Sequence, residues 1–142
     1  MHEFLNKLKQ SFTKDIITVK CRPVFCVEYA LSRLHQEGYK IAVCSNSIRD
    51  TIEMMMEKSA LTPYIDQIIS NQDVTKGKPD PEMYRKAMKE FNLSPKECLI
   101  LEDNENGIKA ARASEGNLLV IGEVANTNYF NIIRRINEIE GE

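Results

Sequence analysis

The sequence predicts an α/β protein with a Rossmann-like parallel sheet flanked by helices. Short apolar runs rich in β-branched residues alternate with segments whose apolar positions recur at helical spacing. The strand-like runs are almost continuously apolar, which is typical of parallel strands that are covered on both faces. The length of 142 residues suits one domain, and the hydrophobic content of 42% is sufficient for a core.

From residue 24 onward, the expected elements are a helix followed by four strand–helix units. Strands are expected at residues 39–45, 66–70, 98–102 and 118–122. Helices are expected at residues 4–12, 24–37, 104–114 and 126–139, with two more around 48–56 and 83–91. Gly38 provides a stop signal, and the glycine and two prolines of residues 75–81 indicate a loop. Asp80 and Pro81 suit the N-cap and the first position of the next helix.

Composition argues against several classes of protein. A net charge of −2 and a pI near 5.8 disfavour a nucleic-acid partner, which would require clustered Lys and Arg. Neither an apolar run of roughly 20 residues, as a membrane span requires, nor a secretory signal pattern occurs in the sequence. Cys21, Cys26, Cys44 and Cys98 follow no zinc-ligand spacing. Buried thiols in a reducing, cytoplasmic setting are therefore favoured over the alternatives, a metal site or a disulfide.

Three polar stretches stand where strands are expected to end or helices to begin. They are "SNS" at residues 45–47, "GKP" at 77–79 and "EDN" at 102–104. Ligands of open α/β sheets bind beyond the carboxyl ends of the strands. We therefore expect these stretches, although distant in sequence, to converge.

The residue types in these stretches suit a phosphate group and a metal ion. Ser45 supplies a hydroxyl, and the amides from Asn46 onward are expected to open a helix, an arrangement that binds anions. Lys78 would place an ammonium beside the same anion. Glu102 and Asp103 supply the hard oxygen ligands that Mg²⁺ accepts beside a phosphate.

Each of these residues also has an ordinary structural interpretation. Ser45 could be only an N-cap, Lys78 a solvated side chain, and the pair Glu102 and Asp103 a helix-capping or surface pair. Their combination, in this order and at strand ends, favours a joint functional site.

The order of these motifs resembles that of the haloacid dehalogenase superfamily, in the branch that includes β-phosphoglucomutase and small sugar-phosphate phosphatases. The matching stretches are "YKIAVCSNS", "GKPDPEMY" and "CLILEDNENGIKAA", and the similarity extends over residues 23–122. Gly107, Ala110 and Ala111 match the small residues that let a helix pack closely on the sheet.

The resemblance implies a role for each candidate residue. Ser45 would contact phosphate, with the amide of Asn46 beside it. Lys78 would offset the charge of phosphate and nucleophile. Asp103 would bind Mg²⁺, and Glu102 is the adjacent acid that we group with it as a metal ligand.

The sequence departs from the family at its first motif. The family has an Asp-x-Asp sequence that ends its central strand, in which the first Asp is the nucleophile and the second the general acid and base. This chain contains no Asp-x-Asp, and Asp15, which precedes Ser45, does not match it. We interpret residues 1–22 as the remnant of a helical cap and its connector, and residues 23–142 as a core without its first strand.

The resulting functional hypothesis is a Mg²⁺-dependent phosphohydrolase or phosphomutase acting on a small phosphorylated metabolite such as a sugar phosphate. Covalent catalysis requires the nucleophile, so the isolated chain is expected to be inactive. The alternative is a non-catalytic module that binds a phosphorylated ligand or a protein. Exposed inner strand edges would favour self-association or a partner that supplies the missing strand.

A response-regulator receiver domain is a further resemblance of "LILEDNE". It would require a phosphoacceptor Asp further along the chain, and residues 104–142 contain none. We therefore reject it.

Overall fold

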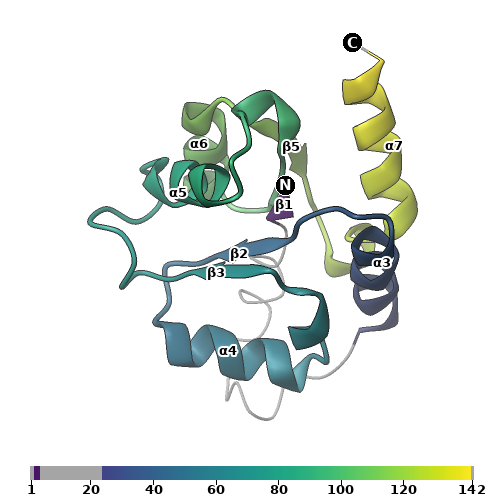
Figure 1. Cartoon of the computed structure of the whole chain (residues 1–142), viewed down its shortest axis with the longest axis horizontal. Helices are drawn as coiled ribbons and strands as arrows, with labels where there is room; N and C mark the ends of the chain where they lie inside the picture. Colours follow the sequence, from purple (N-terminus) through teal and green to yellow (C-terminus); the bar gives the residue numbers. More distant parts are fainter. Residues whose placement is uncertain (1, 4–23, 142) are drawn as a thin grey trace.

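The computed structural model describes residues 2, 3 and 24–141 (Figure 1). The strands are β1 (His2–Glu3), β2 (Ala42–Cys44), β3 (Gln67–Ile69), β4 (Leu99–Glu102) and β5 (Asn117–Val120). The α-helices are α3 (Phe25–Gln36), α4 (Arg49–Lys58), α5 (Glu82–Glu90), α6 (Glu105–Ser114) and α7 (Tyr129–Glu140). Short 3₁₀ helices are η1 (Thr62–Tyr64), η2 (Pro95–Glu97) and η3 (Val124–Asn126). The helix expected at residues 4–12 lies outside the described residues, as does nearly all of the proposed cap remnant.

The α/β architecture with parallel strands between helices is confirmed, but the strands form two hydrogen-bonded sheets. One has the order β1-β4-β5 and the other pairs β2 with β3, all in parallel. The prediction of a single sheet from the four later strands was therefore wrong. β1 is a strand that the sequence analysis did not expect; it pairs with the first half of β4 and also contacts β2.

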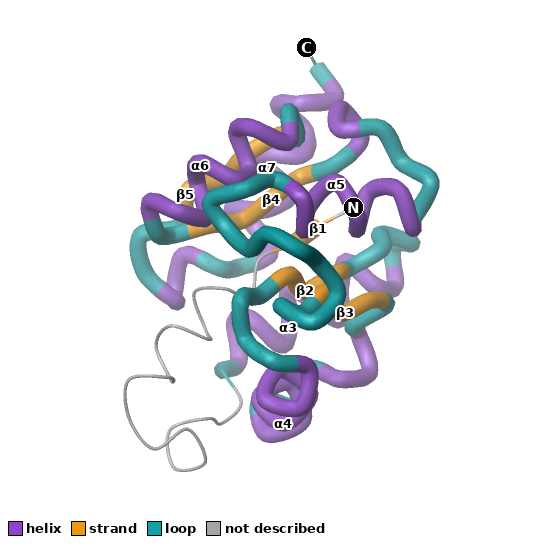
Figure 2. The backbone as a smooth tube through the Cα atoms, turned by 90° about the vertical axis from the view of Figure 1, so that its left-hand side faces the viewer, coloured by secondary structure: helices purple, strands orange, loops and turns teal. Residues whose placement is uncertain are grey.

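The strand faces alternate, which divides the core between two layers. Val43 of β2 with Leu99 and Leu101 of β4 packs in one hydrophobic cluster, together with α3, α4 and α7. Cys44 of β2 and Ile100 of β4 pack in the other, with α5 and α6. Because successive side chains of a strand point to opposite faces, these apolar strands need helices on both sides. Figure 2 shows the strands running between the helices.

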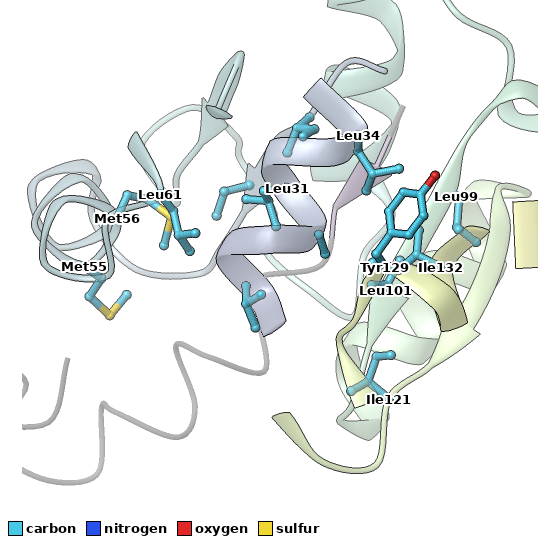
Figure 3. Packing of buried hydrophobic residues seen from close by; sticks show 14 of the residues in the cluster. Leu31, Leu34, Met55, Met56, Leu61, Leu99, Leu101, Ile121, Tyr129 and Ile132 are labelled. Atoms are coloured by element: carbon cyan, nitrogen blue, oxygen red, sulfur yellow. The ribbon is translucent and has the colours of Figure 1, made fainter. Parts of the chain in front are cut away.

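The first cluster is organised around α3. Figure 3 shows α3 between Met56 and Leu61 on one side and Tyr129 and Ile132 of α7 on the other. Leu31 of α3 is fully buried there, and burying a leucine side chain stabilises a fold by about 2 kcal/mol. This packing fixes the helices that frame the sheet.

α3 ends just before Gly38, as expected. The positive φ of 89° at Gly38 is the left-handed conformation that glycine adopts easily.

The first residues of two other helices differ from those that were expected. α4 begins at Arg49, so Asn46 and Ser47 lie in a turn ahead of the helix and not at its first amides. α7 begins at Tyr129, where the side chain of Asn128 accepts a hydrogen bond from the amide of Asn131, and not near residue 126.

Within the part of the chain that the structure describes, no helix is both long and apolar enough to cross a membrane.

Cys44 and Cys98 are buried thiols and Cys26 is half-buried, and these described cysteines form no disulfide. Burial raises the pKa of the Cys98 thiol. The expectation of thiols in the core therefore holds for Cys44 and Cys98.

Candidate functional site

The three polar stretches meet at Lys78, whose main chain contacts Asn46 and whose side chain contacts Glu102. Its ammonium Nζ donates to the carbonyl oxygen of Cys44 at 2.8 Å and to Oε2 of Glu102 at 2.6 Å. Cys44 ends β2, Glu102 ends β4, and Lys78 lies in the loop ahead of α5. The expected convergence is thus confirmed: one ammonium touches the ends of strands from both sheets.

The pair of Lys78 and Glu102 is buried. The Lys78 side chain is 4% exposed and the Glu102 side chain is fully covered. Removing one member of a buried ion pair typically costs about 3–5 kcal/mol, because the other charge remains in the interior without a partner. Lys78 is therefore not the solvated side chain of the ordinary structural interpretation.

Tyr84 of α5 is a third member of this cluster, and the sequence analysis did not identify it. Its hydroxyl donates to Oε2 of Glu102, the oxygen that also accepts from Lys78. The ammonium of Lys78 lies 4.9 Å from the centre of the Tyr84 ring, a distance at which a cation is attracted to the ring face. Tyr84 thus contacts both charged groups.

Glu102 was predicted to be a metal ligand together with Asp103, and the structure gives its carboxylate a different set of neighbours. Oε2 is occupied by the two donors, and α6 covers the rest of the group closely. A Cβ atom built on Gly107 would lie 2.1 Å from Cδ of Glu102, so any larger residue there would force the carboxylate or α6 to shift. Glu102 serves as the partner of Lys78, and its metal-binding role stays a prediction.

Asp103 follows directly after β4 at the same edge of the sheet and is half-buried. The next residue, Asn104, caps α6 by accepting from the amide of Gly107 at 2.8 Å. Among the described residues no group of three or more His, Cys, Asp and Glu side chains could hold a metal ion. Mg²⁺ is often bound by one or two carboxylates together with substrate phosphate and water, and Asp103 at the strand end fits such a partial site.

Ser45 follows directly after β2 and is 1% exposed. Its amide donates to the carbonyl of Ile69 at 3.0 Å, which extends the pairing of β2 with β3. Its Oγ accepts from the amide of Ser47 at 3.2 Å. The hydroxyl therefore stabilises the turn before α4, although it is not the N-cap of that helix.

Asn46 contacts Lys78 through its side chain, whereas its predicted contribution was a main-chain amide. Oδ1 accepts from the Lys78 amide at 3.0 Å, and Nδ2 donates to the Lys78 carbonyl at 3.3 Å. The predicted site residues Ser45, Asn46 and Lys78 are thus brought together, but through contacts that sequence patterns do not reveal.

Two further carboxylates fix the loops around the site. Glu82 accepts from the amide and hydroxyl of Thr75 and from the amide of Lys76, and these bonds hold the pKa of Glu82 below its usual value. Asp73 accepts from the amide and hydroxyl of Ser70 and from Arg49, and the Ser70 amide is the main cause that lowers the pKa of Asp73. Both loops are therefore tied to the helices beside them.

Fold and site together define an α/β protein with a buried lysine–glutamate pair and a half-buried aspartate at the carboxyl edge of its strands. The chain belongs to the haloacid dehalogenase-like hydrolase family, whose model matches residues 1–121. The family resemblance of the sequence motifs is thereby confirmed.

The curated relatives of this chain include phosphatases. It is 34% identical over 131 residues to "Putative phosphatase YhcW" of Bacillus subtilis, an alignment that covers 91% of this chain and 59% of the relative. It is 28% identical to pyrophosphatase PpaX of Bacillus mycoides, covering 76% of this chain and 55% of that protein. The chain thus spans somewhat more than half the length of these relatives.

The solved structures that resemble the chain have the same fold. A "putative beta-phosphoglucomutase" of Thermotoga maritima gives a TM-score of 0.70 at 18% identity, over 78% of this chain and 59% of the other. A subfamily IA hydrolase of the same superfamily from Geobacter sulfurreducens gives 0.68 at 24% identity, over 76% and 53%. At these identities the two structures show that the chain shares their fold.

Proposed function

We propose that this chain provides the phosphate-binding and metal-binding part of a phosphohydrolase or phosphomutase that acts on a small phosphorylated metabolite. The observation that carries the proposal is the ammonium of Lys78, which touches the ends of β2 and β4 where Ser45 and Asp103 follow. A fixed positive charge at a strand edge suits the negative charge of a transferred phosphoryl group.

Each residue of the site has a proposed role. Lys78 offsets charge on the phosphate, with Ser45 in the turn beside it. Asp103 would hold Mg²⁺, which supplies Lewis-acid neutralisation of phosphate oxygens when it is bound. Glu102 holds the ammonium of Lys78 in place through their buried ion pair. Sugar phosphates are the proposed substrates, a proposal that rests on the family resemblance and on the β-phosphoglucomutase-like neighbours.

Turnover by the isolated chain is proposed to be negligible. Charge stabilisation accelerates attack only by a nucleophile that is already in position, and this sequence has no Asp-x-Asp motif. We expect no covalent phosphoenzyme and no measurable phosphate release from p-nitrophenyl phosphate or sugar phosphates. We also propose that a further segment or a second copy of the chain supplies the strand that bears the missing motif.

The test is phosphate release by the chain alone and by a chain extended with an N-terminal segment that bears the family's Asp-x-Asp strand and cap. The extension should restore Mg²⁺-dependent turnover, and Asp103→Ala should abolish it. Robust turnover by the unextended chain, lost on Asp15→Ala, would contradict the assignment of the site.

A non-catalytic module that binds a phosphorylated ligand is the second candidate, and the missing motif favours it. It predicts that the extended chain stays inactive while the unextended chain binds inorganic phosphate. Size-exclusion chromatography with light scattering, with and without the added segment, tests the proposed self-association.

A further inference from the structure

The amide group of Asn46 holds the main chain of Lys78 on both sides of that residue. Oδ1 accepts from the Lys78 amide at 3.0 Å, and Nδ2 donates to the Lys78 carbonyl at 3.3 Å. Both bonds come from one planar group, so together they fix the distance and the orientation of the Lys78 peptide units relative to the turn after β2.

Gly77 leaves the room that this contact requires. A Cβ atom on Gly77 would lie 2.6 Å from Oδ1 and 3.0 Å from Cγ of Asn46, closer than carbon atoms of side chains normally approach such groups. The backbone at Gly77 is not left-handed, so an alanine there is unfavourable because of Asn46 and not because of φ. A larger residue at 77 would push the Asn46 side chain away from Lys78.

The charged end of the Lys78 side chain is bound by the strand that leads into this turn. Its ammonium donates to the carbonyl of Cys44 at 2.8 Å, two residues before Asn46. Lys78 is therefore bound twice, at its main chain by the turn after β2 and at its charged end by the last residue of β2. The aliphatic part of the side chain spans the distance between these contacts.

We propose that Asn46 is a positioning residue whose side chain acts on the site through Lys78. The Asn46–Gly77 contact sets where the Lys78 main chain lies, and this determines whether the ammonium reaches Cys44 and Glu102. The proposal rests on the proposed function only in assuming that Lys78 faces phosphate. In this proposal the side-chain amide of Asn46 binds the main chain of Lys78, and phosphate is bound by Lys78 and Ser45.

The test compares Asn46→Ala, Gly77→Ala and the double variant. All three atoms nearest to a Cβ at position 77 belong to the Asn46 side chain beyond its Cβ, and Asn46→Ala removes them. Each single substitution should therefore break the same contact, and the second should add little to the first. Asn137→Ala and Gly141→Ala, at exposed positions of α7 and its end, are the matched controls.

Two quantities are measured in each variant: the hydrogen-exchange rate of the Lys78 amide by NMR, and the Kd for inorganic phosphate by titration. Loss of hydrogen bonds of this kind predicts about a tenfold faster exchange and about a tenfold weaker Kd in Asn46→Ala and in Gly77→Ala. The double variant should match Asn46→Ala, and the controls should match the unsubstituted chain.

The outcomes separate this inference from the proposed function. Unchanged exchange of the Lys78 amide in Asn46→Ala, or effects of the two substitutions that simply multiply, would overturn the positioning role. Altered exchange with an unchanged Kd for phosphate would also overturn it. If the unsubstituted chain binds no phosphate, the proposed function fails, and the exchange rates alone decide whether Asn46 holds Lys78.

Discussion

Two donors share one oxygen of a buried carboxylate at the centre of the site. Tyr84 and Lys78 both donate to Oε2 of Glu102, and Tyr84 itself is completely buried. Hydrogen bonds to charged groups contribute more than neutral ones, about 1.5–3 kcal/mol. The hydroxyl of Tyr84 should therefore contribute measurably to the stability of the protein.

Tyr84→Phe is predicted to lower the free energy of unfolding by about 2 kcal/mol, because it removes this donor and leaves the ring in place. Urea unfolding followed by circular dichroism measures the change. Tyr64→Phe is the matched control, since Tyr64 is half-buried in η1 and its hydroxyl is outside the cluster. Equal effects of the two substitutions would contradict the role of the Tyr84 hydroxyl.

Gly107→Ala is predicted to destabilise the protein by about 1–3 kcal/mol, because the added methyl group would overlap the Glu102 carboxylate. This sign is opposite to the gain of up to about 1 kcal/mol that alanine normally brings to a helix. The comparison is again by urea unfolding, with Gly141→Ala as the control at a roomier site. A stabilised Gly107→Ala variant would show that α6 can move away from β4.

At the scale of elements, the loop that carries Lys78 is attached to the start of α5. Glu82 in the first turn of α5 accepts from the Thr75 amide and hydroxyl and from the Lys76 amide. The amide of Glu82 in turn donates to Oδ1 of Asp80 at 3.0 Å. Loop and helix therefore form one unit, and Lys78 lies between its two ends.

Glu82→Gln is predicted to lower stability at neutral pH, with a difference that shrinks in acid. The pKa of Glu82 is lowered from 4.5, chiefly by the Thr75 amide, so its stabilising effect is present above that value. The effect is lost as pH falls through the lower folded-state pKa. Urea midpoints between neutral pH and pH of about 3 measure it, with Glu57→Gln at an exposed position of α4 as the control. A difference that does not change with pH would contradict the role of the carboxylate charge.

The sequence predicts the order of the elements better than their ends. The alternation of apolar runs and helical patterns is enough to place Ser45, Lys78 and Asp103 at one edge, because parallel strands end on the same side of a sheet. The expectation that the amides from Asn46 onward open a helix was wrong, because the hydroxyl of Ser45 and the amide of Ser47 form a turn ahead of α4. Such local hydrogen bonds compete with helix formation, and the spacing of apolar residues does not predict them.

At the scale of the whole molecule, the sequence pattern of β4 indicates that the Glu102 side chain points into the protein, although it does not reveal the partners of the carboxylate. Alternation along β4 puts Glu102 on the same face as Ile100, the face that α5 and α6 cover, so its side chain is directed into the protein. The contact of Asn46 with Lys78 could not be predicted from the sequence, because it depends on where two loops meet after the sheets are assembled. The pairing of residues 2 and 3 with β4 is likewise a long-range contact of a segment too short to show periodicity.

Inorganic phosphate is predicted to stabilise the folded chain, and Mg²⁺ to add to the effect through Asp103. A ligand that binds only the folded state at ten times its Kd raises the free energy of unfolding by about 1.4 kcal/mol. Scanning calorimetry with phosphate, Mg²⁺ and both together measures the shift in melting temperature. Asp103→Asn should remove the part that depends on Mg²⁺ and retain the part that depends on phosphate.

The depth of the Lys78–Glu102 pair has a consequence for the effect of ionic strength. Dissolved salt screens charges that face water, such as Arg49 and Asp73, whose side chains are 39% and 27% exposed. Counterions cannot come between Lys78 and Glu102, since their side chains are 4% and 0% exposed. Concentrated salt should therefore loosen the attachment of the loop after β3 while the charges at the centre of the site stay as they are.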